Sequence, residues 1–243
     1  IVDLKILYVE LNSTIYYNPA QIASASNLRT EIINSLEAYS KNVEINKFGG
    51  RFKYSKINTL IDRVDNGITS NITKVIIRRD MKALINQFAQ YELCFGNRFN
   101  VKPEGLNIKS TGFRIQGQSD TVFITDTPNA DKLTGVISIV KRDETTGTNI
   151  VVVKSAGTVD YVHGEVNLTT INIVSTDKPN NIVEVQAFPD SNDVIGLQDL
   201  YLEFNIPNST INMVKDTITS GEQISGVGYR VTSSYANGDL TRT

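Results

Sequence analysis

Apolar residues that recur with the period of an α-helix occur in only one part of this chain, near its N-terminal end. Between positions 22 and 39 they are spaced three and four residues apart, which places them on one face of a helix. The members of this face are Ile22, Ala25, Leu28, Ile32, Leu36 and Tyr39. Asn18-Pro19 precedes the pattern. Because proline lacks an amide donor and has a helical φ, we expect it in the first turn of this helix.

A second, shorter helix is predicted after the break at Gly49-Gly50. Ser55 is the expected N-cap, because its hydroxyl can accept a hydrogen bond from a free backbone amide. The apolar face consists of Ile57, Leu60, Ile61 and Val64. Asn66-Gly67 follows it, and these residues tolerate the left-handed conformation that ends many helices.

Three segments rich in β-branched, aromatic and aliphatic residues surround the two helices and are predicted strands. They span residues 4–11, with 15–17 as an extension beyond a polar interruption, then 73–77 and 88–95. The first 100 residues are therefore predicted to form a small β-α-α-β-β sheet with two helices on one face.

Helical periodicity ends near residue 100, and short apolar runs then alternate with turn-forming residues. Hairpins are predicted for 136–140 with 150–153 and for 159–161 with 165–168, and further strands for 171–174, 182–188 and 200–206. Such a series is typical of a sandwich or a barrel. We therefore predict an α+β protein with a module at 1–100 and a β-rich interaction domain at 101–243. From Ser220 onward, either a last hairpin ending at Val231 or a flexible arm is expected.

Composition excludes several kinds of partner. The net charge of −2 over 243 residues gives no general attraction to nucleic acid or to acidic membranes. Arg78-Arg79 could meet a phosphate, but we expect the solvated end of a strand there. No apolar run approaches the roughly 20 residues that cross a bilayer, so membrane insertion is not expected. The chain starts at Ile1 almost within a strand, and we expect it to be part of a longer protein.

Residues for catalysis, cofactor binding or metal binding are not apparent. His163 is the only histidine and Cys94 the only cysteine, so a zinc site of the usual Cys/His kind cannot be assembled within this chain. His163 lies in a predicted turn without a nucleophile motif. Asp190-Ser191-Asn192-Asp193 resembles a calcium loop only superficially, since Ile195 occupies the position that requires glycine. Gly226-Val227-Gly228 lacks the third glycine of a dinucleotide site. The sequence favours an interaction protein over an enzyme.

The residues from 4 to 81 resemble a known family. The resemblance is carried by the strand 7–11, by the end of the first helix at 33–39, by Gly49-Gly50-Arg51-Phe52, by Ser55-Lys56-Ile57 and by Ile72-Thr73-Lys74-Val75. In this order and spacing they resemble the C-terminal α/β module of the baseplate J-like family. These are wedge proteins of contractile-tailed bacteriophages and related injection machines. The β-rich continuation is similar to the larger, T-even-type members.

The resemblance implies a structural protein of the virion, located in the tail baseplate and assembled in the host cytoplasm. It implies a homodimer or ring oligomer that binds other baseplate wedge proteins. Such proteins surround the tail hub in a ring that rearranges when the sheath contracts. We expect the β-rich region to carry most subunit contacts. The main alternative is a carbohydrate-binding adhesin, for which the ten tyrosines are suitable but the absence of tryptophan is not. A cell-wall hydrolase is a further alternative.

Overall fold

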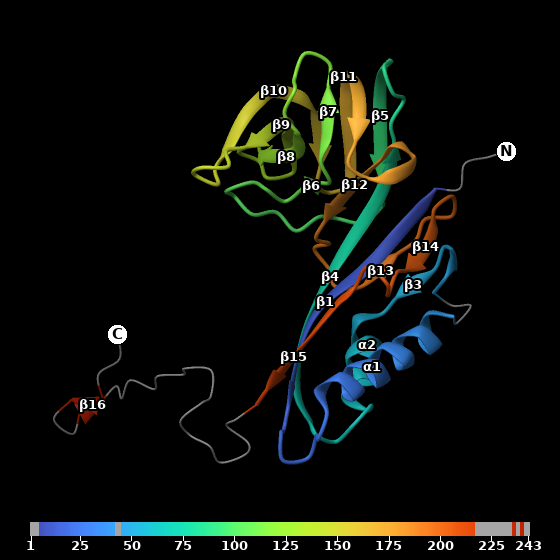
Figure 1. Ribbon diagram of the computed structural model, residues 1–243, viewed down its shortest axis with the longest axis vertical. Helices are drawn as coiled ribbons and strands as arrows, with labels where there is room; N and C mark the ends of the chain where they lie inside the picture. The colour runs from blue at the N-terminus through green and yellow to red at the C-terminus, as the bar shows by residue number, and fades with distance from the viewer. Residues whose placement is uncertain (1–4, 42–44, 217–234, 237–238, 241–243) are drawn as a thin grey trace.

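The structure is a computed structural model that describes residues 5–41 and 45–216, together with the backbone of two short strands near the C-terminus (Figure 1). Long strands form a sheet with two helices beside it, and a β-barrel lies at one end of these strands (Figure 1). The helices are α1 (Ala25–Ser40), α2 (Tyr54–Asp62) and the single 3₁₀ turn η1 (Pro179–Asn181). The strands are β1 (Ile6–Tyr17), β2 (Lys47–Phe48), β3 (Arg51–Phe52), β4 (Ile68–Lys82), β5 (Phe88–Cys94), β6 (Lys109–Ser110), β7 (Phe113–Ile115), β8 (Phe123–Pro128), β9 (Thr134–Arg142), β10 (Asn149–Asp160), β11 (Glu165–Thr176), β12 (Ile182–Ala187), β13 (Val194–Ile195), β14 (Tyr201–Phe204), β15 (Thr210–Lys215), β16 (Tyr235–Ala236) and β17 (Asp239–Leu240).

β1 and β4 form the antiparallel centre of the larger sheet, from the pair Tyr8 and Arg78 to the pair Tyr17 and Ile68. The extension of the first strand beyond its polar interruption is confirmed. Ser13 lies within that interruption and is fully buried. Its hydroxyl accepts a hydrogen bond from the Thr73 hydroxyl at 2.9 Å, so the polar residue is satisfied inside the sheet.

The first helix forms where its apolar period predicts, and Leu28, Ile32 and Leu36 are buried against the sheet. Its predicted start at Pro19 is wrong, because the helix begins at Ala25. Asn18 closes a turn around Pro19 by accepting hydrogen bonds from the amides of Ala20 and Ile22. Ser24 is the N-cap, and its hydroxyl accepts the amide of Asn27 at 3.3 Å.

The second helix also forms, but its predicted cap is wrong. The helix begins at Tyr54, one residue before Ser55, and Lys53 at the cap position makes no side-chain hydrogen bond. Instead the Tyr54 amide donates to Oδ1 of Asp193 at 2.8 Å, so the cap comes from 139 positions further along the chain. This partner cannot be inferred from local sequence.

The predicted left-handed end at Asn66-Gly67 is also wrong. Neither residue has a positive φ, and Arg63 ends the helix in the ordinary helical region. Gly67 serves a different purpose, since a Cβ there would lie 2.7 Å from the Ile22 side chain. Because residue 67 has no Cβ, the turn before α1 can approach the start of β4 closely.

Strands from the second half of the chain complete the larger sheet, which has seven strands in the order β2-β14-β1-β4-β12-β6, with β15 also on β1. β14 and β15 lie end to end along the same edge of β1, and both run parallel to it. At their junction the Leu11 amide donates to the Ser209 hydroxyl at 2.9 Å. The strand predicted for 200–206 forms as β14, and its alternate residues Leu200, Leu202, Phe204 and Ile206 are all buried. The division near residue 100 stays a prediction.

The β-rich region contains a closed barrel. β8, β9, β10 and β11 are antiparallel neighbours, and β7 pairs with β11. The ring is closed between Phe113 and Val122, whose amides and carbonyls bond reciprocally at 3.0 and 2.8 Å. Both predicted hairpins are confirmed, β9 with β10 and β10 with β11. The α+β class with a barrel-like β-rich region is therefore confirmed.

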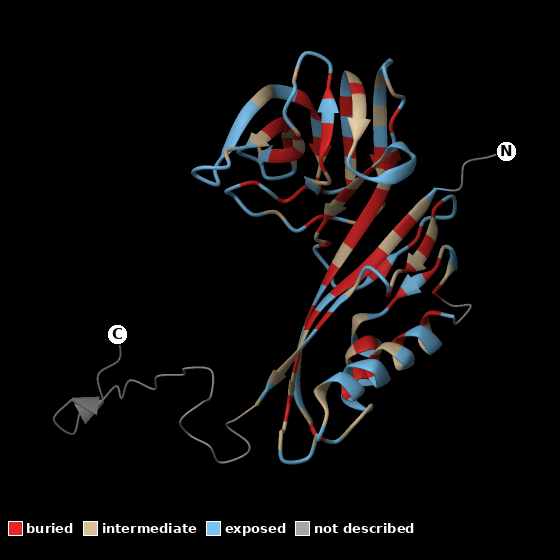
Figure 2. Ribbon diagram, in the orientation of Figure 1, coloured by how far each residue is buried: buried red, intermediate tan, exposed pale blue. Residues whose placement is uncertain are grey.

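The third predicted strand, β5, forms at the expected place but lies in the other sheet, where it pairs with β11. β12, much later in the chain, takes the position beside β4. One hydrophobic cluster continues from the two helices into the barrel interior, and Figure 2 shows buried residues running along β1 and β4 toward the barrel.

No helix within the described residues is both long enough and apolar enough to cross a membrane. The expected hairpin or arm ending at Val231 lies outside the described residues, as does Gly226-Val227-Gly228.

Candidate assembly surface

His163 is held in the turn between β10 and β11 by a single carboxylate. Its Nδ1 lies 2.7 Å from Oδ2 of Asp160, and the other oxygen of Asp160 accepts the amides of Val162 and His163. The imidazole is 71% exposed, and this hydrogen bond with Asp160 raises the pKa of His163 above its ordinary 6.5. The position is that of a solvated turn residue, as the sequence indicates.

The acidic loop at Asp190-Ser191-Asn192-Asp193 is occupied by contacts within the protein. Asp190 pairs with Arg98 at 3.4 Å, and Asp193 caps α2. Among the described residues there is no group of three or more His, Cys, Asp or Glu side chains that could hold a metal ion. The expectation of no metal, cofactor or catalytic residue stays a prediction.

The largest correction concerns Arg78-Arg79, which we expected at the solvated end of a strand. Both lie inside β4 and are buried, with 3% and 7% of their surfaces exposed. Arg78 Nε donates to Oε1 of Glu10 at 2.6 Å, and its guanidinium carbon lies 4.1 Å from the centre of the Tyr8 ring. A buried arginine needs such partners, because an uncompensated charge away from water is very costly.

Two more carboxylates complete the cluster around Arg78. Asp80 on the same strand accepts a hydrogen bond from Nη1, and Glu184 on β12 approaches the same nitrogen at 3.4 Å. Glu184 also binds Lys178 at 3.0 Å. Three strands, β1, β4 and β12, therefore contribute charges that meet at one guanidinium.

Burial and charge shift the pKa values of this cluster. Burial raises the pKa of the Glu10 carboxyl above its ordinary 4.5, although the hydrogen bond from Arg78 acts in the opposite direction. The pKa of Asp80 is likewise raised by burial. Burial also acts to lower the pKa of Arg78, but the carboxylates prevail and raise it. Because Arg78 binds carboxylates from three strands, this cluster is suited to fixing the strand register.

Arg79 faces the opposite side of the sheet and has fewer partners. Its Nη1 donates to the carbonyl of Ile6 at 3.1 Å, whereas its Nε is buried without a hydrogen-bond partner. Burial lowers the pKa of Arg79.

The part of the sheet away from the barrel leaves one face uncovered. The odd-numbered residues of β1 from Leu7 to Tyr17 are buried on the side of the helices. Alternation and register place the opposite set on a surface that we call the open face. The open face consists of Asn12, Thr14, Tyr16, Ser70, Ile72, Lys74, Ile76, Thr210, Asn212 and Val214. Ile72 at its centre is 54% exposed.

On the two strand edges beside the open face, side chains donate hydrogen bonds to backbone carbonyls. At the β4 edge, the Thr73 carbonyl accepts a hydrogen bond from the Tyr54 hydroxyl at 3.0 Å. At the β15 edge, the Ile211 carbonyl accepts one from Nε of Arg29 at 3.1 Å. Side chains that occupy edge carbonyls hinder the addition of another strand. One backbone carbonyl on each of these edges is therefore already occupied by a side chain of the same chain.

Comparison with known families matches the same part of the chain. Residues 5–80 match the family described as baseplate structural protein gp6, C-terminal domain III. The match covers β1, α1, α2 and nearly all of β4, and it supports a structural role in a bacteriophage baseplate and thus a place in the virion. No curated protein matches the chain.

Proposed function

We propose that this chain is the C-terminal portion of a baseplate wedge subunit of a contractile, T-even-type phage tail. In this role it associates with a second copy of itself and binds other wedge proteins. The observation that carries the proposal is the family match over residues 5–80, which coincides with the scaffold whose outer sheet face is uncovered.

The open face suits a protein that assembles. It lies on three hydrogen-bonded strands and combines exposed apolar groups such as Ile72 with polar ones such as Lys74 and Asn212. Stable interfaces bury about 1,200 Å² or more and are most apolar at their centre. We propose that the open face forms a self-complementary contact in which the same residues of two copies meet.

Point variants test this contact better than removal of the β-rich region does. Truncation after residue 100 would also delete β12, β14 and β15 from the larger sheet, so the scaffold itself would be disrupted. Ile72→Lys places a charge at the centre of the open face without touching the core. We expect it to shift the chain to monomer in sedimentation velocity experiments.

Ile195→Lys is the matched control, because Ile195 is 47% exposed and lies in β13, away from the open face. We expect it to leave the association state unchanged. Equal association of the wild-type chain and the Ile72→Lys variant would overturn the assignment of the open face.

Binding to wedge proteins is tested by using the chain as bait in a phage-infected lysate, with mass spectrometry as the readout. Stoichiometric recovery of tail and baseplate proteins is expected. Recovery of surface polysaccharide without tail proteins would overturn the assembly role in favour of a carbohydrate-binding module.

A further inference from the structure

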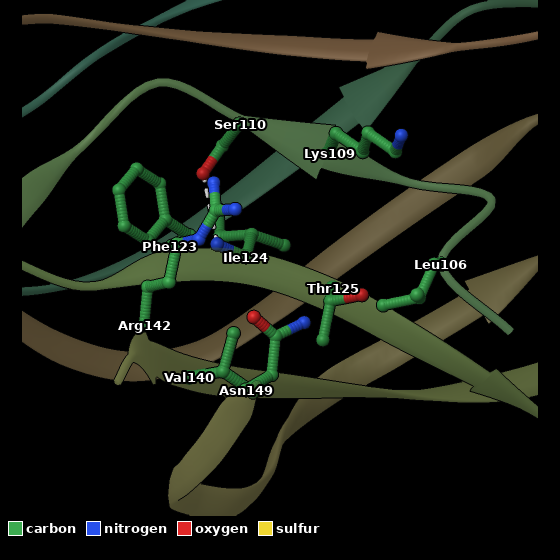
Figure 3. A pocket seen from close by; sticks show the side chains of 9 residues that line it. All are labelled: Leu106, Lys109, Ser110, Phe123, Ile124, Thr125, Val140, Arg142 and Asn149. Atoms are coloured by element: carbon green, nitrogen blue, oxygen red, sulfur yellow. Dashed lines mark hydrogen bonds between the residues drawn. The ribbon is translucent and has the colours of Figure 1, made fainter. Parts of the chain in front are cut away.

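A cleft of about 410 Å³ lies on the outside of the barrel, where β6 and the residues before it approach β8, β9 and β10 (Figure 3). It belongs neither to the open face nor to the ion cluster around Arg78. The residues that line it are Leu106, Lys109, Ser110, Phe123, Ile124, Thr125, Val140, Arg142 and Asn149.

Several polar groups in this cleft have no partner within the described part of the chain. The Thr125 hydroxyl is buried without a hydrogen bond, and its residue is only 8% exposed. The cations of Lys109 and Arg142 form no ion pair with a described residue, whereas Lys141 next to Arg142 binds Asp120 at 2.8 Å. The residues that line the cleft include no carboxylate.

A buried hydroxyl without a partner is costly, and the exposed side chains of Lys109 and Arg142 add positive charge at the mouth of the cleft. A carboxylate is the group that would satisfy both. Arginine can bind it through two parallel hydrogen bonds, lysine through a point charge, and a threonine hydroxyl by donating its proton. The chemistry of the donors therefore selects an anion with oxygen acceptors.

The cleft also offers apolar contact. Val140 and the ring of Phe123 line it, Leu106 at its rim is 48% exposed, and Figure 3 shows Arg142 beside Phe123. A second cleft of about 690 Å³ shares Phe123 and Arg142, but Asp120, Asp143 and Glu144 also line it, so an acidic group is confined to the first cleft. A ligand that fits the first cleft carries an apolar group next to its carboxylate.

We propose that the first cleft binds an acidic peptide segment of a partner protein. One Asp or Glu side chain of the segment lies between Lys109 and Arg142, and a neighbouring apolar side chain packs on Phe123. The inference deepens the proposed function, because it gives the chemistry of one contact with another baseplate protein.

A displayed library of random heptapeptides tests this directly, sorted against the purified, labelled chain. We expect enrichment of sequences with Asp or Glu next to an apolar residue. The Lys109→Gln/Arg142→Gln variant should bind the selected peptides at least about tenfold more weakly, because the loss of one hydrogen bond to a charged group lowers affinity by about that factor. Arg51→Gln/Lys154→Gln removes the same charge from positions outside the cleft and should change Kd less than about twofold.

Thr125→Val separates ligand binding from folding. It removes the unpartnered hydroxyl at nearly constant volume, so the free energy of unfolding should stay the same or rise while peptide affinity falls several-fold. Unchanged affinity would remove Thr125 from the site.

Other outcomes would overturn the proposal. These are no enrichment, enriched peptides without a carboxylate, equal binding by the double variant, or tighter binding of a single-stranded DNA oligonucleotide. Displacement of the peptides by equimolar inorganic phosphate would indicate an adventitious ion only. The peptide assay uses the purified chain, so failure of the lysate experiment would not overturn the proposed peptide site. Failure of the peptide assay would likewise not overturn the proposed assembly role.

Discussion

Arg78 and Glu10 form a hydrogen-bonded ion pair inside the sheet, with Nε and Oε1 2.6 Å apart and each side chain only 4% exposed. The two residues lie on adjacent strands, β4 and β1, and Arg78 stands directly opposite Tyr8. A shift of one residue in this pairing would turn the arginine to the helix side and leave the carboxylate without its cation. The pair therefore enforces the register on which both the scaffold and the open face depend.

Removing the cation should be far more damaging than its single charge suggests. In Arg78→Met, the carboxylates of Glu10 and Asp80 lose their cation while Glu184 retains Lys178, and we expect the free energy of unfolding to fall by about 3–5 kcal/mol. Urea denaturation measures it. Arg114→Met is the matched control on an exposed residue and should stay within about 0.5 kcal/mol of wild type. A loss below about 1 kcal/mol for Arg78→Met would show that the cluster does not hold the strands together.

The Glu10 carboxyl should make the protein less stable as the pH rises. Because its pKa in the folded state is raised above 4.5, the folded protein retains a proton that the unfolded chain has already lost. Stability is therefore lost as the pH increases from about 4.5 through the raised pKa. The glutamine side chain of Glu10→Gln does not ionise, so the stability of this variant relative to wild type should improve over that pH range.

Denaturation series at several pH values measure this effect. Asp143→Asn is a comparison variant at a carboxyl group whose pKa is lowered rather than raised. The amides of Thr145 and Thr146 hold the pKa of Asp143 below 3.8, so its contribution is present above that value and is lost as the pH falls. Parallel pH dependence of Glu10→Gln and the wild-type chain would contradict the assignment.

The cluster itself could not be found from the sequence. Arg78-Arg79 follows a run of β-branched residues, and charged pairs in that position usually meet water. The strand continues instead to Lys82, because β12 supplies Glu184 and Gln186 as neighbours more than 100 positions later. Elements with a local period were predictable, namely α1, α2 and the two hairpins. The pairing of β1 with β4 was also predicted, but their further partners β12, β14 and β15 were not, because no local signal specifies which distant strand pairs with an edge.

The N-cap of α2 is likewise supplied by a residue distant in the sequence, and its contribution to stability can be tested. Asp193→Ala removes the acceptor for the Tyr54 amide, and we expect a loss of about 1 kcal/mol in the free energy of unfolding. Ser55→Ala, at the position that the sequence favours, should cost less than about 0.5 kcal/mol. Urea denaturation of the two variants decides between the caps, and a larger effect of Ser55→Ala would restore the local one.

His163 gives a direct test of the turn between β10 and β11. The hydrogen bond that the imidazole donates to the Asp160 carboxylate raises the pKa of His163, so its imidazole should titrate above 6.5 in the folded chain. NMR measures the midpoint without ambiguity, because the chain contains one histidine. Asp160→Asn keeps an oxygen acceptor for the amides of Val162 and His163 but removes the negative charge, and the midpoint should fall toward 6.5. In the wild-type chain, the raised pKa of His163 stabilises the folded state at pH values below the pKa of the unfolded state. This stabilisation is lost as the pH rises through the pKa of the folded state. An unchanged midpoint in Asp160→Asn would mean that another group sets the charge of His163.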